Sequence, residues 1–209
     1  GIGSGSLEET TQTRNTVAIG LQAGDALISG SYNIYIGNEA GKAAIKTQGD
    51  TAVGYRALNL STGIDTGDAE NNSCNTAIGY ATLTSNTEGQ KGTAVGANAL
   101  ANNTIGLCNT ALGHEAGCNI TTGDRNITIG DAAGLCLSTE NNNTVVGNCS
   151  GYRLESSDNV SLGKDAMKGD GDITGGTNTA LGTRAGECLT GASVGNVFIG
   201  FRAGPATGT

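Results

Sequence analysis

Acidic residues gather in the segment 59–73, NLSTGIDTGDAENNS, and they are the side chains with the clearest capacity for chemistry. The carboxylates of Asp65, Asp68 and Glu70 could supply oxygen ligands to a hard cation such as Ca²⁺. Their spacing is not that of an EF-hand or of a glycine-rich calcium repeat, so a solvated acidic loop is the favoured interpretation. We therefore expect no cofactor, with a structural Ca²⁺ as the weaker hypothesis.

A second acidic segment, KGDGDITGG at 168–176, carries the same calcium hypothesis with less force through Asp170 and Asp172. The single histidine, His114, has no serine or cysteine partner in a recognisable triad motif. No glycine-rich fragment has the spacing of a nucleotide-binding loop. A pair of carboxylates that cleaves glycans at a groove between subunits is the enzymatic alternative that stays open. The favoured prediction is a protein that is not an enzyme.

Composition argues against an ordinary globular domain. Of 209 residues, 36 are glycine and only 36% are hydrophobic, with two Phe and no Trp, which is too few large apolar side chains for a thick core. The net charge of −8 and the lack of a basic stripe predict no nucleic-acid partner. No apolar run approaches the length of a membrane span, so we expect no membrane insertion in this segment.

A short motif ending in glycine recurs eleven times, from VAIG at 17–20 to VFIG at 197–200. Six of the ten intervals between the closing glycines are 17 residues, and one is 25, which assigns an eight-residue insertion to the segment 59–73. Such a period is the signature of a stacked repeat architecture. We predict an all-β solenoid of about eleven 17-residue rungs, each with a strand, a turn, a second short strand and a turn.

The residues around each closing glycine fall into columns, and we number the glycine as position 0. Position −1 is always Ile, Val or Leu, position −3 is Thr, Val or Ile, and position −2 is mostly Ala. Side chains alternate along a strand, so −3 and −1 share one face. We expect this face to point into the rung and the small −2 face to meet another chain. The resulting core is too thin for a monomer, which predicts a homotrimer.

Six threonines occupy position −3, and regular threonine rows can order water on an ice-binding surface. The alternation along the strand argues for an inward or interface position instead. These threonines are Thr51, Thr76, Thr93, Thr110, Thr144 and Thr179.

Position −4 is asparagine in eight rungs. Asparagine tolerates turn backbone and hydrogen-bonds nearby main chain, so one asparagine per rung at a fixed corner predicts a ladder of side chains bonded to neighbouring turns. The column consists of Asn33, Asn75, Asn109, Asn126, Asn143, Asn159, Asn178 and Asn196.

The six cysteines show no C-x-x-C spacing and, with a single histidine, predict neither a zinc site nor a dense disulfide framework. Cys74 and Cys108 occupy one column two rungs apart, which is too far for a bond. Cys118 and Cys136 are about one rung apart and are the one pair within a chain that could be oxidised. We expect mostly free thiols.

The columns, best seen in NTAIGYATLTSNTEGQKGTAVGANAL at 75–100, resemble the YadA-like head repeat of trimeric adhesins, and especially its 17-residue form in tail fibres of phages and large viruses. The resemblance covers about residues 14–204. It implies a left-handed parallel β-roll that is trimeric and non-catalytic. Tyr35 and Phe198, at the small −2 position, and the irregular intervals after Gly147 depart from the family pattern.

The resemblance predicts a fibre segment on the virion surface that attaches to a glycan or protein receptor of the host cell. The head of a bacterial adhesin at the cell surface and a fibre-borne glycan-degrading enzyme are the alternatives. Residues 1–14 are interpreted as a linker or cloning remnant, 15–204 as the repeat domain and 205–209 as a tail of what we expect to be a piece of a longer protein. The insertion supplies the receptor-contact candidates Asp65, Asp68, Glu70, Asn71 and Asn72.

Overall fold

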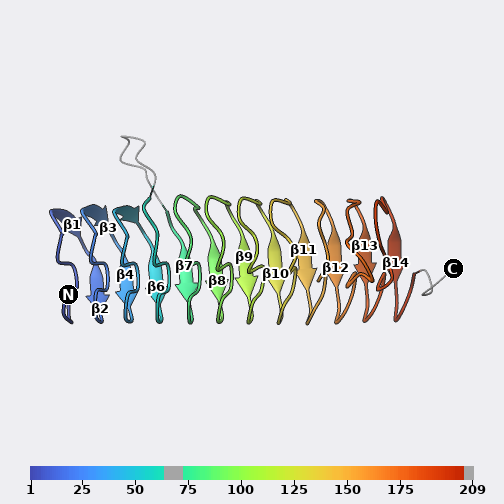
Figure 1. Ribbon diagram of the computed structural model, residues 1–209, viewed down its shortest axis with the longest axis horizontal. Coiled ribbons are helices and arrows are strands. Elements are labelled where there is room, and N and C mark those ends of the chain that lie inside the picture. Colours follow the sequence, from blue (N-terminus) through green and yellow to red (C-terminus); the bar gives the residue numbers. More distant parts are fainter. Residues whose placement is uncertain (64–72, 205–209) are drawn as a thin grey trace.

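The computed structural model describes residues 1–63 and 73–204, and it is an all-β parallel solenoid. Each of eleven rungs contributes one three-residue strand to a single parallel sheet, and the rungs lie side by side along the long axis of the molecule (Figure 1). No helix occurs in these two ranges. With a strand spacing of about 4.8 Å, the stack is roughly 50 Å long. The prediction of an all-β solenoid of about eleven rungs is confirmed.

The strands of the large sheet follow chain order, so every neighbour is the next rung. They are β2 (Val17–Ile19), β4 (Ile34–Ile36), β6 (Thr51–Val53), β7 (Thr76–Ile78), β8 (Thr93–Val95), β9 (Thr110–Leu112), β10 (Ile127–Ile129), β11 (Thr144–Val146), β12 (Val160–Leu162), β13 (Thr179–Leu181) and β14 (Val197–Ile199).

The pairing register follows the sequence columns. Thr76 pairs with Thr93, and Thr93 pairs with Thr110, so equivalent positions of successive repeats lie next to one another. Across the 25-residue interval Thr51 still pairs directly with Thr76. The extra residues between these strands therefore add no rung to the stack.

A second sheet contains only three strands, β1 (Gln12–Arg14), β3 (Ser29–Ser31) and β5 (Lys46–Gln48). The expectation of a second strand in every rung is therefore wrong for the described rungs after β5. Some of these rungs keep hydrogen bonds that converge on one carbonyl of the next rung, such as those from Thr87 N and Gly89 N to Thr104 O at 2.9 and 3.1 Å, without the run of paired residues that makes a strand.

The assignment of the two strand faces also needs correction, because position −2 points into the rung and positions −3 and −1 point outward. Ala111 is 1% exposed, whereas its neighbour Leu112 is 48% exposed. The alternation itself holds along the strands, as the burial pattern of β9 illustrates. The predicted assignment of inner and outer face was the reverse of the observed one. The interior at this position is narrow enough to be filled by a methyl group, and the large core side chains come from other positions.

Each rung draws its large core side chain mainly from position +4 or from position +7. Leu58, Leu83 and Leu100 fill the core from +4 in a left-handed backbone conformation with φ near 50°. In most rungs that have glycine at +4, the buried aliphatic lies three residues later, as in Ile120 and Leu137. Bringing one large aliphatic to most levels keeps the core continuous along the axis.

Tyr35 is the large exception at position −2, and it is fully buried. Its ring occupies the space beside two +4 glycines: a Cβ added at Gly41 would lie 2.5 Å from the ring, and one at Gly24 would lie 2.9 Å from it. The phenol oxygen is 2.6 Å from Thr47 Oγ1. The local absence of side chains on the neighbouring turns is what admits the ring.

The position-0 glycines are required by rung stacking. Gly113 has φ of 136°, and a Cβ on it would lie 2.6 Å from the carbonyl oxygen of Gly130 on the next rung. A side chain at this position would push two rungs apart, which explains why the motif closes on glycine.

Residues 1–14, interpreted from the sequence as a linker, lie on the N-terminal end of the solenoid (Figure 1). Ile2 forms a parallel bridge with Ile19, and β1 pairs with β3. Gly3, 17 residues before Gly20, has φ of 129° and packs against that glycine's carbonyl as a position-0 residue does. These residues supply a further, partial rung.

Candidate functional site

The outer face of the eleven-stranded sheet is an apolar strip, which we define as positions −3 and −1 of every strand. Val17, Ile34, Ile78, Leu112 and Leu181 are among its exposed members. The strip is continuous because the strands are in register from β2 to β14.

The position −3 threonines lie on this outer strip, so of the two positions expected for them, inward or at an interface, the inward one is wrong. They are half-buried or exposed, as in Thr93 of β8 and Thr110 of β9. Each shares its strand with an aliphatic residue at −1, for example Val95 beside Thr93. The face is therefore a mixture of methyl-bearing side chains rather than a plain threonine surface.

The position −4 asparagines form a buried ladder at the corner before each strand. Asn126 N donates to Asn109 Oδ1 at 2.9 Å, and Asn143 N donates to Asn126 Oδ1 at 3.0 Å. The amide nitrogens donate to main-chain carbonyls, as Asn109 Nδ2 does to Gly123 O at 2.6 Å. Since buried backbone groups are costly when unpaired, this column holds successive rungs together.

Asp50 replaces asparagine at one rung of the ladder, and sequence analysis did not single it out. Its Oδ1 accepts from Asn75 N at 2.8 Å, but its Oδ2 makes no hydrogen bond within the described residues. Burial raises the pKa of the Asp50 carboxyl to about 7, and the hydrogen bond from the Asn75 backbone opposes that rise. A carboxylate in a column that is otherwise asparagine in eight rungs, with Thr16 and Gly92 as the other exceptions, was the signal that could have found it.

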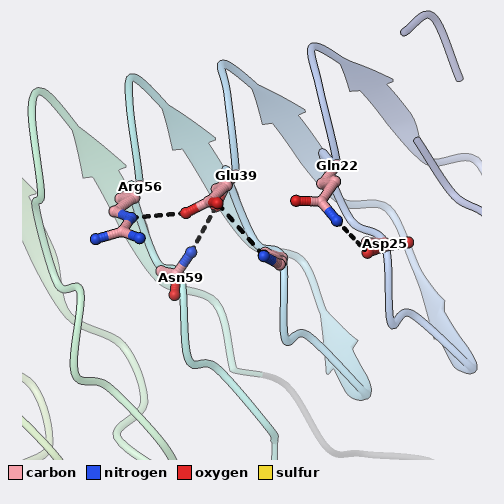
Figure 2. Close-up of polar contacts among 6 residues, drawn as sticks. Gln22, Asp25, Glu39, Arg56 and Asn59 are labelled. Atoms are coloured by element: carbon pink, nitrogen blue, oxygen red, sulfur yellow. Dashed lines mark hydrogen bonds and ion pairs between the residues drawn. The ribbon is translucent and has the colours of Figure 1, made fainter. Parts of the chain in front are cut away.

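Polar side chains also pair between rungs on the solvent side of the solenoid. Glu39 accepts from Arg56 Nε at 2.6 Å and from Lys42 Nζ at 3.3 Å, and Asn59 Nδ2 donates to Glu39 O at 3.0 Å (Figure 2). The carboxylate of Glu39 therefore has a lowered pKa, chiefly through Arg56. This network fixes the direction of the Arg56 side chain.

The exposed tyrosines of two neighbouring rungs stack on one another beside this network. The ring centroids of Tyr55 and Tyr80 are 5.2 Å apart with an interplanar angle of 18°. The Arg56 guanidinium carbon lies 5.5 Å from the Tyr55 centroid. Aromatic pairs on a surface are frequent in binding sites because they combine a flat apolar face with low conformational entropy.

The receptor-contact candidates Asp65, Asp68, Glu70, Asn71 and Asn72 lie outside the described residues. The calcium candidates Asp170 and Asp172 are exposed, and Asp172 Oδ1 lies 3.7 Å from Arg153 Nη1. Within residues 1–63 and 73–204, no group of three or more His, Cys, Asp or Glu side chains is close enough to hold a metal ion. The described residues thus do not bring a calcium site together.

The histidine is paired with a carboxylate of the next rung, and the cysteines are unpaired thiols. His114 Nδ1 is 2.9 Å from Asp131 Oδ1 on the next rung, and both side chains are exposed. All six cysteines are free. Burial raises the pKa of Cys118 to about 11 and also raises that of Cys136, so neither thiol is activated as a nucleophile.

Fold and surface define this chain as a parallel β-solenoid repeat protein. Comparison with protein-family models, curated proteins and solved structures gave no match. The described part of the chain contains no helix that is long and apolar enough to cross a membrane.

Proposed function

We propose that this chain is a segment of a homotrimeric attachment fibre on a virion surface, where it contacts a glycan or protein receptor of the host cell. The observation that carries the proposal is the apolar strip on the outer face of the sheet. Soluble proteins rarely expose a long contiguous apolar surface without a partner. Burying the strip against further copies of the chain removes it from water.

The geometry of the strip favours copies of the same chain arranged around a common axis. Its chemistry is nearly the same at every level from β2 to β14, so a parallel copy meets matching side chains along the whole length. A closed cyclic arrangement satisfies every strip, whereas an open one leaves one strip uncovered. The number three and the left-handed winding come from the resemblance of the NTAIG repeat to YadA-like heads.

Attachment fits the remaining surface. A rigid rod with three-fold symmetry presents each solvent-facing feature three times at one level, and three weak contacts gain by avidity on a repetitive cell surface.

The oligomeric state is tested by analytical ultracentrifugation. We expect a species of about three times the chain mass of 20.7 kDa. A single species at the mass of one chain, over a concentration series up to the highest soluble level, would end the proposal.

The insertion at 59–73 is proposed as one receptor contact, and shortening it to restore the 17-residue interval tests this. Because Thr51 and Thr76 already pair directly, the shortened chain should keep its stack and its assembly. We expect at least a tenfold fall in binding of the labelled assembly to host cells, because three contacts are removed at once. Unchanged attachment would show that the loop takes no part in binding.

A further inference from the structure

Tyr80 presents an exposed aromatic ring on the solvent side of the solenoid. Its exposed fraction is 58%, against 40% for Tyr55, the ring stacked on it. Tyr55 in turn packs against Arg56, and Arg56 Nε donates a hydrogen bond to the carboxylate of Glu39 (Figure 2). One neighbour of Tyr80 is therefore fixed in place.

The rung on the other side of Tyr80 has only the methyl group of Ala97 in the same column, and we call the interval between Tyr80 and His114 above this methyl the space beside Ala97. Asn98 N donates to Tyr80 O at 2.9 Å and Glu115 N donates to Ala97 O at 2.9 Å, so Tyr80, Ala97 and His114 follow one another at position +1 of three successive rungs. Ala97 ends at a methyl group. The larger side chains on either side come from rungs about 10 Å apart, which is twice the strand spacing.

The side chains around this space are held away from it or carry free polar groups. His114 is bonded to Asp131 of the following rung, which lies on the side away from Ala97. The carboxamide of Asn98 makes no hydrogen bond to the described residues. Glu115 Oε1 is 3.7 Å from His114 Nε2 and is 41% exposed.

We propose that Tyr80, Ala97 and His114 form a slot that binds one pyranose ring of a neutral glycan. The C–H face of a pyranose packs on the Tyr80 ring, and the methyl of Ala97 forms the floor. Asn98 and Glu115 bond hydroxyl groups at the rim. This inference rests on the proposed attachment function and names its ligand class.

A neutral sugar fits the charge of the slot better than an acidic one. Glu115 and Asp131 flank a single histidine, and the whole chain has a net charge of −8. A sugar carboxylate would meet like charge at this site, which lowers affinity and the rate of encounter. Arg56 does not reverse this, since Glu39 already neutralises it.

The test uses the assembled protein and saturation-transfer NMR with the methyl glycosides of glucose, galactose and N-acetylglucosamine, and with N-acetylneuraminic acid as the acidic probe. We expect transfer to the C–H protons of one ring face of at least one neutral glycoside and none to the acidic probe. Tyr80→Ala should weaken binding roughly tenfold, the loss of one stacking contact. Ala97→Leu should abolish the signal by filling the slot while keeping Tyr80; a leucine already occupies position +1 of the first full rung, at Leu21.

Tyr32→Ala is the matched control, because Tyr32 is also exposed, at 61%, but lies at position −5 and has no stacked partner among the described rings. It should leave glycan binding unchanged. Neutral binding that survives Ala97→Leu, transfer to the acidic probe alone, or no binding by the wild type would each overturn the slot. Dissociation of the assembly by Tyr80→Ala would overturn it as well, since Tyr80 would then be a subunit contact.

Failure of the slot and failure of the attachment function give different results. Glycan binding without attachment to host cells leaves the slot standing and removes the proposed function. Attachment that is unchanged by Ala97→Leu removes the slot as the receptor site and leaves the fibre proposal intact.

Discussion

Asp50 is a buried carboxyl whose ionisation should lower the stability of the folded chain. The carboxyl is fully buried, its pKa is raised from 3.8 to about 7, and one of its oxygens has no partner among the described residues. A raised pKa means that the folded chain holds a proton that the unfolded chain has already lost. The free energy of unfolding should therefore be highest below pH 4 as far as this group is concerned, and should fall as the pH rises through 7.

Replacement of Asp50 by Asn tests this assignment. The variant should be more stable than the wild type above pH 7, by on the order of 4 kcal/mol, and the difference should vanish towards pH 4. Denaturant unfolding of both proteins between pH 4 and 8 measures it, with Glu88→Gln at an exposed position as the control. A constant difference across this range, or a less stable variant at pH 8, would contradict the assigned ionisation.

At the scale of the rung, the sequence predicted the strands and their register, but it did not predict which strand face points inward. The 17-residue period and the strict glycine column placed the strands in their correct register, because only glycine fits against the next rung's carbonyl. The choice of inner face failed because aliphatic residues were assumed to be inside. In a narrow rung, Ala111 fills the inner side and Leu112 lies on the outer side.

The large side chain of the core comes from position +4 in some rungs and from position +7 in others. A comparison of one sequence position at a time therefore did not predict it. Leu100 at +4 lies in a rung whose +7 residue is Asn103, whereas the next rung has Gly117 at +4 and Ile120 at +7. Neither column is uniformly apolar. Their combination delivers one large apolar side chain to most levels, and the level with Gly41 and Ala44 is filled by Tyr35 instead.

This compensation can be tested by moving the aliphatic side chain within one rung. Leu100→Gly should cost about 3 kcal/mol, because it leaves a cavity in the buried column. Adding Asn103→Leu should restore part of that loss, although it removes the bond from Asn103 Nδ2 to Asn86 Oδ1. Thermal unfolding of both variants and of Asn103→Leu alone decides the matter. If the double variant is no more stable than Leu100→Gly, the two positions do not substitute for each other.

At the scale of the whole molecule, the repeat builds a rod whose rungs are joined by hydrogen bonds and whose sheet carries an exposed apolar strip on its outer face. Main-chain hydrogen bonds and the asparagine ladder hold rung to rung, and they do not depend on another chain. The side chains of the apolar strip are only partly buried in a single chain. Folding and assembly should therefore be separable.

Leu112→Asp tests that separation. Leu112 is 48% exposed on the strip, so a charge there is solvated in one chain and should leave its β-sheet circular dichroism spectrum intact. In the assembly, three carboxylates would be buried without partners at one level, which should cost several kcal/mol and disperse the trimer to single chains in the ultracentrifuge. Ile105→Asp is the matched control, because Ile105 is also 48% exposed but lies outside the strands that form the strip. A Leu112→Asp protein that unfolds would mean that the side chain is needed inside the rung, and one that keeps the wild-type mass would mean that subunits meet on another face.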